Sequence, residues 1–135
     1  MSQSNKKIVQ DFLAAVLRGD REGMRPHLHP ELEVVEPASL PYGGVWKGHE
    51  GMFALSEKVF SVWKDCQVTV RDMVADGDKV IGLYEMRGAG RASGIPFKVH
   101  VTEVMRIQDG KIKDIEVFYF DTKMLNDVHA GKVGA

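Results

Sequence analysis

Two glutamates stand in stretches whose other residues are typical of buried strands. Glu36 closes the stretch at residues 32–36 and is followed by Pro37, and Glu103 lies in the middle of residues 99–107. An ionised carboxylate in apolar surroundings is costly unless it is paired, hydrogen-bonded or kept neutral. Two such carboxyls in one pocket could act in general acid–base catalysis, one as proton acceptor and the other as donor. The sequence therefore indicates a pocket with titratable groups.

Strand alternation predicts which side chains share a face with Glu103, because successive strand residues point to opposite faces. If Glu103 points inward, its strand would surround it with apolar side chains. The other inward residues are then Val99, Val101, Met105 and Ile107. The outward residues are His100, Thr102, Val104 and Arg106.

Each candidate also has a purely structural interpretation. Glu36 could be a solvated carboxylate at a strand end, and Glu103 could form an internal salt bridge, for example to Arg91. Asp121 precedes a short helical pattern and is interpreted first as its N-cap and only second as a catalytic carboxylate. Cys66 has no histidine in its sequence context, so a buried thiol is favoured over a nucleophile.

The composition restricts the class of protein. A chain of 135 residues that is 44% hydrophobic fits one domain, residues 1–135, with a core of its own. Its 18 basic and 19 acidic residues nearly cancel, so nucleic acid is not an expected partner. The longest apolar run, residues 12–17, is too short to span a membrane. No signal peptide is recognisable and there is a single cysteine, so a cytoplasmic location is expected.

No metal or other cofactor is predicted. His27 and His29 are one residue apart, but no further His or Cys has ligand spacing, so a surface loop is favoured over a metal site. The glycines at positions 88, 90 and 94 do not follow the strand–glycine–helix arrangement that binds phosphate.

Hydrophobic periodicity predicts helices first and strands later. Helical spacing covers residues 5–18 and 48–63, and a short helix is expected from Asp20 through Met24 to Leu28, although Pro26 interrupts it. The dipeptide at 109–110, Asp-Gly, is a strong hairpin signal. The expected strands are residues 32–36, 67–75, 79–87, 97–108 and 111–120, followed by a short helix at 121–128. This order predicts an α+β domain whose last four strands form an antiparallel meander.

This order of elements, with several short motifs, resembles the nuclear transport factor 2-like superfamily, and within it the SnoaL-like proteins and the ketosteroid isomerases. The resemblance covers almost the whole chain. It implies a cone in which a curved mixed sheet wraps around three N-terminal helices and a deep pocket. The motifs that carry it are residues 10–15, 18–20, 35–37, 44, 46–48, 105–107, 109–112 and 119–121.

The resemblance assigns roles to individual residues. Glu36 occupies the position of the isomerases' general base, and Glu103 that of their protonated acid, which donates to the developing oxyanion. Phe12 replaces the tyrosine that is the second oxyanion donor, and losing one such donor typically costs roughly 100- to 1000-fold in rate. A steroid isomerase is therefore not expected. Tyr119 replaces a pocket-lining phenylalanine and could restore a hydroxyl from another wall.

The resulting expectation is a cofactor-free isomerase, cyclase or hydrolase acting on a small hydrophobic carbonyl or epoxide compound. The alternatives are a non-catalytic binding module and a dimeric assembly module of the same fold. A homodimer is expected through the outer sheet face, which would carry His100, Val104, Phe118 and Phe120. The catalytic candidates are Glu36, Glu103 and Tyr119, and the pocket-lining candidates are Phe12, Tyr42, Trp46, Met52, Phe53, Val101, Met105, Ile115 and Val117.

Overall fold

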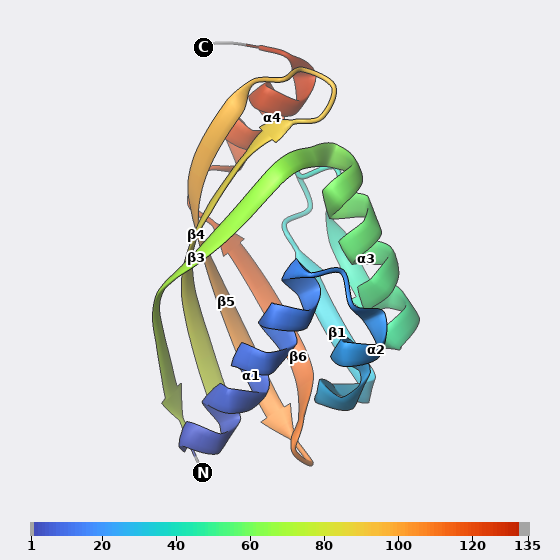
Figure 1. Cartoon of the computed structure of the whole chain (residues 1–135), viewed down its shortest axis with the longest axis vertical. Coiled ribbons are helices and arrows are strands. Elements are labelled where there is room, and N and C mark those ends of the chain that lie inside the picture. The colour runs from blue at the N-terminus through green and yellow to red at the C-terminus, as the bar shows by residue number, and fades with distance from the viewer. Residues whose placement is uncertain (1, 133–135) are drawn as a thin grey trace.

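A six-stranded sheet forms the body of the molecule, and helices cover its concave face (Figure 1). The computed structural model describes residues 2–132. The helical elements are α1 (Ser2–Leu17), α2 (Arg21–Met24), the 3-10 turn η1 (Arg25–His27), α3 (Gly48–Val62) and α4 (Thr122–Ala130). The strands are β1 (Leu28–Glu36), β2 (Gly44–Lys47), β3 (Trp63–Asp76), β4 (Lys79–Gly90), β5 (Pro96–Gln108) and β6 (Lys111–Tyr119).

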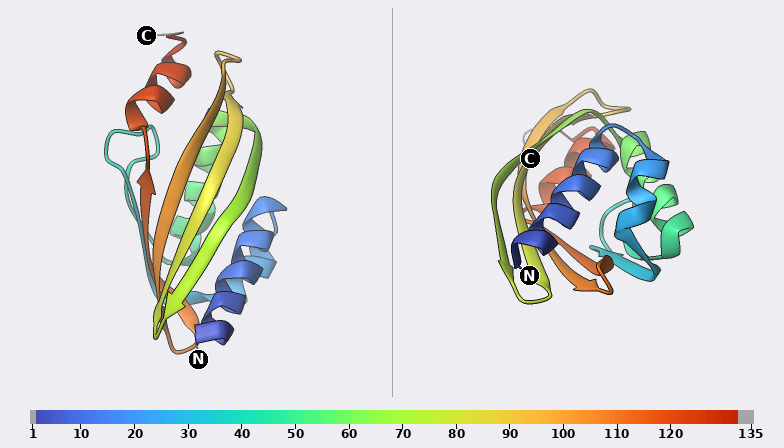
Figure 2. Two further views of the ribbon diagram at one scale, coloured as in Figure 1. Left: turned by 90° about the vertical axis from the view of Figure 1, so that its left-hand side faces the viewer. Right: turned by 60° about the horizontal axis from the view of Figure 1, so that its bottom comes forward.

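The strands lie in the order β2-β1-β6-β5-β4-β3. Strands β3 to β6 form the antiparallel meander that the sequence predicts, and β1 joins it parallel to β6. The sheet is therefore mixed, and it curves strongly around the helices (Figure 2). The α+β class and the curved sheet with N-terminal helices are confirmed.

Two helices fill the concave side of the sheet. Helix α1 packs against β3 and β4, and helix α3 packs against β1 and β2. Residues spaced three apart on α1, Val9, Phe12 and Ala15, are buried against the core, as the helical periodicity predicts. Helix α4 lies at the far end of the molecule, where it contacts β4 and β5 (Figure 1).

The local signals for turns and caps are confirmed. Asp109 and Gly110 both have positive φ angles, 55° and 71°, as the tight turn between β5 and β6 requires. The Asp121 side chain accepts a hydrogen bond from the backbone N–H of Met124 at 2.9 Å, so Asp121 is the N-cap of α4. Asp20 caps α2 in the same way through Gly23.

Two element boundaries and one additional strand differ from the sequence expectation. Strand β1 begins at Leu28, so this residue belongs to a strand and not to the short helix, and a register shift after Leu28 accommodates Pro30. Strand β2 lies between the expected strand at 32–36 and the expected helix at 48–63, where no strand is predicted. Strand β3 begins at Trp63, whose backbone is already extended, and an irregularity at Asp65 (φ 55°) follows. Among residues 2–132, no helix is long and apolar enough to cross a membrane.

Candidate functional site

A cavity lies between the concave face of the sheet and helices α1 and α3. Its volume is about 120 Å³, and its walls are mostly apolar. Since an apolar cavity of about 150 Å³ holds one benzene molecule, this space has roughly the size of one small ring. The lining residues are Leu13, Val16, Leu17, Glu36, Met52, Leu55, Ser56, Val59, Phe60, Cys66, Val68, Tyr84, Met86, Val101, Glu103 and Tyr119.

Glu36 lies at the last position of β1 and points into this cavity. Burial alternates along the end of the strand, so Leu32, Val34 and Glu36 share the inner face. The side chain is only 7% exposed, and its Oε1 atom has no hydrogen-bond partner among residues 2–132. Burial, followed by the charge of Glu103, raises the pKa of Glu36 to about 8, and a hydrogen bond from Tyr119 partly opposes this. The alternative of a solvated strand-end carboxylate is therefore wrong.

Glu103 projects from the centre of β5 into the same cavity. Val101 and Met105 on either side are buried, which confirms the alternation expected for this strand. The side chain is partly exposed and lines the cavity, and burial of its carboxyl raises the pKa of Glu103 to about 7. The suggested salt bridge to Arg91 is wrong, because that guanidinium donates to the carbonyl oxygens of Phe60 and Trp63 at 2.7 and 3.2 Å.

The two carboxyls influence each other's ionisation. The charge of Glu103 raises the pKa of Glu36, and burial raises the pKa of both carboxyls, so the two groups titrate as a pair. A negative charge on one carboxyl disfavours a second charge nearby. Between the two steps the pair therefore holds one proton, which makes one member an acid and the other a base. Neither glutamate forms an ion pair within residues 2–132.

A chain of hydroxyls leads to Glu36 from the core. The indole N–H of Trp63 donates to the Tyr42 hydroxyl at 3.0 Å, and the Tyr42 hydroxyl donates to the Tyr119 hydroxyl at 3.0 Å. Because an indole can only donate, it fixes the direction of the chain and leaves the Tyr119 proton for Glu36. Burial raises the pKa of Tyr42 to about 12 and that of Tyr119 well above its ordinary value, so both remain neutral donors.

Tyr84, on β4, is a cavity residue that sequence reasoning missed. Its side chain is 3% exposed, and its hydroxyl is buried without a hydrogen-bond partner. The signal was present in the sequence, because alternation along β4 puts Val80, Gly82, Tyr84 and Met86 on one face. Without the register to β5, however, no pattern shows that this face meets Glu103.

The pocket-lining candidates are divided between the cavity and its surroundings. Met52 and Val101 line the cavity, whereas Phe53 lies in an adjoining groove together with Arg21. Trp46 donates from its indole N–H to the Tyr42 carbonyl at 3.0 Å and so holds the loop after β1. The candidates that lie in the hydrophobic core or against it, and do not line the cavity, are Phe12, Tyr42, Trp46, Met105, Ile115 and Val117.

The cavity has an opening between the end of α1 and the side of α3. Leu17 lines the cavity and is 43% exposed, while Ser56 and Phe60 line both the cavity and the adjoining groove. Arg21 and Glu57, which line that groove, form an ion pair.

Inside the cavity, burial raises the pKa of the Cys66 thiol, which keeps it neutral.

Metal binding finds no support in this geometry. Within the described part of the chain, no group of three or more His, Cys, Asp or Glu side chains could hold a metal ion. His29 accepts a hydrogen bond at Nδ1 from the backbone N–H of Glu31, so it is engaged in local structure.

The family model described as the SnoaL-like domain matches residues 9–115, and the chain belongs to this family. No curated protein matches the chain. Members of this family are related in fold to the polyketide cyclases and ketosteroid isomerases, as the sequence resemblance implies.

Solved structures share the fold over almost the full length. A nuclear transport factor 2-like protein from Burkholderia xenovorans is 24% identical, with a TM-score of 0.85, covering 96% of this chain and 98% of that one. A SnoaL-like polyketide cyclase, described as putative, from Jannaschia is 17% identical (TM-score 0.82; 100% and 96% covered). A protein with a ketosteroid isomerase-like fold from Catenulispora acidiphila, solved with trimethylamine, is 16% identical (TM-score 0.77; 91% and 92% covered).

Proposed function

We propose that this protein is a cofactor-independent enzyme that acts by carboxylate acid–base catalysis on a small hydrophobic compound carrying a carbonyl or epoxide group. The observation that supports it most is the pair of glutamates, which line one apolar cavity that has no Lys, Arg or His among the described residues of its walls. Structural carboxylates inside proteins are normally paired, because an unpaired buried charge is costly. An unpaired couple with raised pKa values at a cavity wall is the arrangement expected of an acid–base site.

In the proposed reaction Glu36 is the base. Its Oε1 atom has no partner and is free to accept a proton, and Tyr119 stabilises the charge on the carboxylate. Glu103 is the acid, because burial beside apolar strand neighbours raises its pKa and favours the protonated form. A bound carbonyl oxygen accepts a hydrogen bond from Glu103 only when Glu103 is protonated. Binding of the ligand therefore keeps the shared proton on Glu103.

The electron and proton balance is simple. For a carbonyl compound, Glu36 removes a proton from the adjacent carbon, the electron pair moves to the oxygen, and Glu103 donates to that oxygen. Glu36 then gives its proton to another carbon while the oxygen returns its proton to Glu103, which re-forms the carbonyl group, completes an isomerisation and restores both carboxyls. For an epoxide, Glu36 takes a proton from water, the oxygen of that water attacks carbon, and Glu103 protonates the oxygen of the breaking C–O bond.

The size of the cavity restricts the compound. A volume of about 120 Å³ encloses roughly one ring, so a steroid nucleus does not fit within the closed walls. A larger compound would have to extend past Leu17 and Phe60 through the opening. We therefore expect single-ring or short-chain compounds to be turned over before larger ones.

The test is a screen of cyclic ketones, enones and epoxides with the wild-type protein, Glu36→Gln and Glu103→Gln. Glu36→Gln removes the base and should abolish turnover while the fold is retained. Glu103→Gln keeps a donor and should leave part of the activity. Glu33→Gln, a change on the outer face of the same strand, is the control and should be fully active. Binding of these compounds without turnover by the wild-type protein would instead favour a binding module.

A further inference from the structure

The Tyr84 hydroxyl is a buried polar group that no side chain or backbone group of residues 2–132 satisfies. Within residues 2–132, only two buried side-chain atoms have no hydrogen-bond partner, Glu36 Oε1 and Tyr84 Oη. Both residues line the same cavity. Since nearly all buried polar groups in native proteins are hydrogen-bonded, two exceptions at one cavity indicate that a bound molecule supplies the missing partners.

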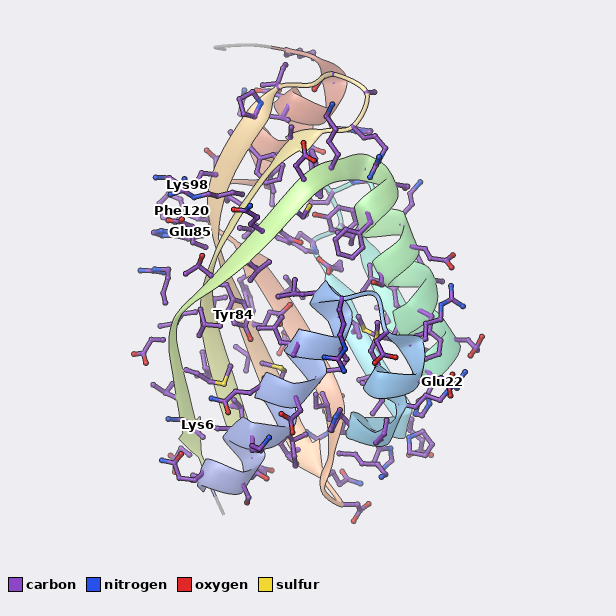
Figure 3. The ribbon with its side chains drawn as sticks, in the orientation of Figure 1. Lys6, Glu22, Tyr84, Glu85, Lys98 and Phe120 are labelled. Atoms are coloured by element: carbon purple, nitrogen blue, oxygen red, sulfur yellow. The ribbon has the colours of Figure 1, made fainter. Side chains whose placement is uncertain are left out.

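A glycine beneath the ring fixes the position of this hydroxyl. A Cβ atom added to Gly82 would lie 2.2 Å from Tyr84 Oη and 2.4 Å from Tyr84 Cζ. The ring therefore lies along β4, with its hydroxyl directly over the Gly82 backbone. Figure 3 labels Tyr84 on this strand, and the next residue, Glu85, is labelled on the outer side of the sheet.

The same glycine places the hydroxyl beside Glu103. Gly82 is the cross-strand partner of Glu103 in the β4–β5 ladder, and the charge of Glu103 contributes to raising the pKa of Tyr84, after burial. The Tyr84 phenol therefore stays protonated, and donating to an acceptor would supply the hydrogen bond that it lacks. Glu36, the other unsatisfied group, comes from β1 and approaches the cavity from a different strand.

The other two tyrosines of the site are already engaged. Tyr42 accepts from Trp63 and donates to Tyr119, and Tyr119 acts on the carboxyl of Glu36. Tyr84 takes part in none of these bonds. Of the three phenols it is therefore the one whose proton is available to a ligand.

We propose that the Tyr84 hydroxyl donates a hydrogen bond to the oxygen atom of the bound compound and so sets its orientation. This inference rests on the proposed function, because it concerns the same cavity. The carbonyl or epoxide oxygen lies toward Tyr84 and Glu103, and the carbon that loses a proton, or is attacked by water, lies toward Glu36. Tyr84 is a specificity-determining residue in this arrangement, since it selects compounds that present an acceptor on that side.

The experiment compares two probes of nearly equal shape, cyclohexanone and methylenecyclohexane, which differ in having a C=O or a C=CH₂ group. Their affinities are measured by NMR titration below the titration range of both carboxyls, for the wild-type protein, Tyr84→Phe and Tyr119→Phe. Tyr84→Phe should weaken cyclohexanone binding about 3- to 10-fold and leave methylenecyclohexane unchanged. Tyr119→Phe removes a cavity hydroxyl that is already engaged, so it should not discriminate between the probes.

A second variant displaces the hydroxyl without removing it. Gly82→Ala should push the Tyr84 ring away from its place and reproduce the selective loss of cyclohexanone affinity. The carbonyl stretching frequency of bound cyclohexanone should also be higher in Tyr84→Phe than in the wild-type protein, because the oxygen has lost a donor.

The outcomes separate this inference from the proposed function. Equal affinity of cyclohexanone for the wild-type protein and Tyr84→Phe overturns the role of Tyr84, while the cavity remains a ligand site. Equal weakening of both probes also overturns it, since Tyr84 would then act only through packing. If neither probe binds the wild-type protein, the ligand cavity itself fails, and the proposed function fails with it.

Discussion

Glu36 and Glu103 are surrounded by different groups, and this difference organises the site at the scale of single residues. Glu36 lies at the end of a chain of donors that begins at the Trp63 indole. Glu103 has apolar strand neighbours and the uncommitted Tyr84 hydroxyl beside it. The Tyr119 hydroxyl therefore stabilises a negative charge on Glu36, whereas Glu103 lies beside the Tyr84 hydroxyl, which a ligand can use as a donor.

The raised pKa values predict that the fold loses stability as the pH rises. A carboxyl whose pKa is higher in the folded than in the unfolded state stabilises the fold fully below its unfolded pKa. For Glu36 this contribution is lost between about 4.5 and about 8, the unfolded and folded pKa values. At 1.36 kcal/mol for each pKa unit, the loss is up to about 5 kcal/mol.

Glu36→Gln should therefore reduce the difference in unfolding free energy between about pH 5 and about pH 9, since glutamine mimics the neutral acid. Urea unfolding at both pH values measures this difference. Glu33→Gln, on the exposed face of the same strand, should behave as the wild-type protein does. A pH dependence in Glu36→Gln as steep as that of the wild type would show that Glu36 is not a neutral buried acid at low pH.

Replacing Tyr119 with Phe should raise the pKa of Glu36 further, because the Tyr119 hydrogen bond lowers it. The change also removes the acceptor of the Tyr42 hydroxyl, so stability should fall by about 1–3 kcal/mol. Carboxyl ¹³C titration and urea unfolding measure the two effects. A pKa of Glu36 that stays the same or falls in Tyr119→Phe would contradict the hydroxyl chain.

Part of this site follows from the sequence, and part depends on how strands align. Glu36 and Glu103 stand out because each interrupts an apolar pattern, and alternation gave the correct neighbours of Glu103. Tyr84 does not interrupt an apolar pattern: alternation places it on the inner face of its strand, where a tyrosine is normally a core residue. Arg91 was assigned to the wrong partner, since its contacts are backbone carbonyls of residues about 30 positions away, which no local pattern reveals.

At the scale of elements, the sequence predicts turns and helix caps, but it does not predict which segment pairs as the edge strand of the sheet. Asp109-Gly110 and Asp121 were correctly predicted because each signal acts within a few residues. Strand β2 was missed because its four residues, Gly44–Lys47, carry turn and aromatic residues and pair with β1 only through the fold. Trp63 was assigned to a helix by periodicity, although its burial belongs to the start of β3.

The N-cap of α4 offers a test at this scale. Asp121→Ala removes the acceptor of the Met124 N–H and should lower the unfolding free energy by about 0.5–2 kcal/mol. Asp121→Asn keeps an acceptor and should lose much less. The titration of Glu36 and Glu103 should be the same in both variants. A change in turnover without a change in stability would restore the catalytic interpretation of Asp121.

At the scale of the whole molecule, the outer side of the sheet exposes two large aromatic side chains. Phe118 is 52% exposed and Phe120 86% exposed, and Figure 3 labels Phe120 beside Glu85 and Lys98 on the outer side of β4 and β5. Exposed aromatic residues on a sheet face are typical of interfaces between subunits. We propose that two copies of the chain pair through this face with two-fold symmetry.

Light scattering should then give about twice the monomer mass of 15.0 kDa at micromolar concentration. Phe118→Lys should shift the protein toward the monomer, because it places a charge in the paired surface. Ala54→Lys, on the exposed side of α3, is the matched control and should leave the mass unchanged. A wild-type protein that is monomeric at this concentration would contradict the proposed dimer.

The central claim is that Glu36 and Glu103 share one cavity and one proton near neutral pH. Titration of the ¹³C-labelled carboxyls of the wild-type protein, Glu36→Gln and Glu103→Gln tests it most directly. We predict two steps in the wild-type protein with pKa values of about 7 and about 8, and a single raised step in each variant. Two glutamates that titrate near the ordinary value of about 4.3 would contradict the acid–base pair.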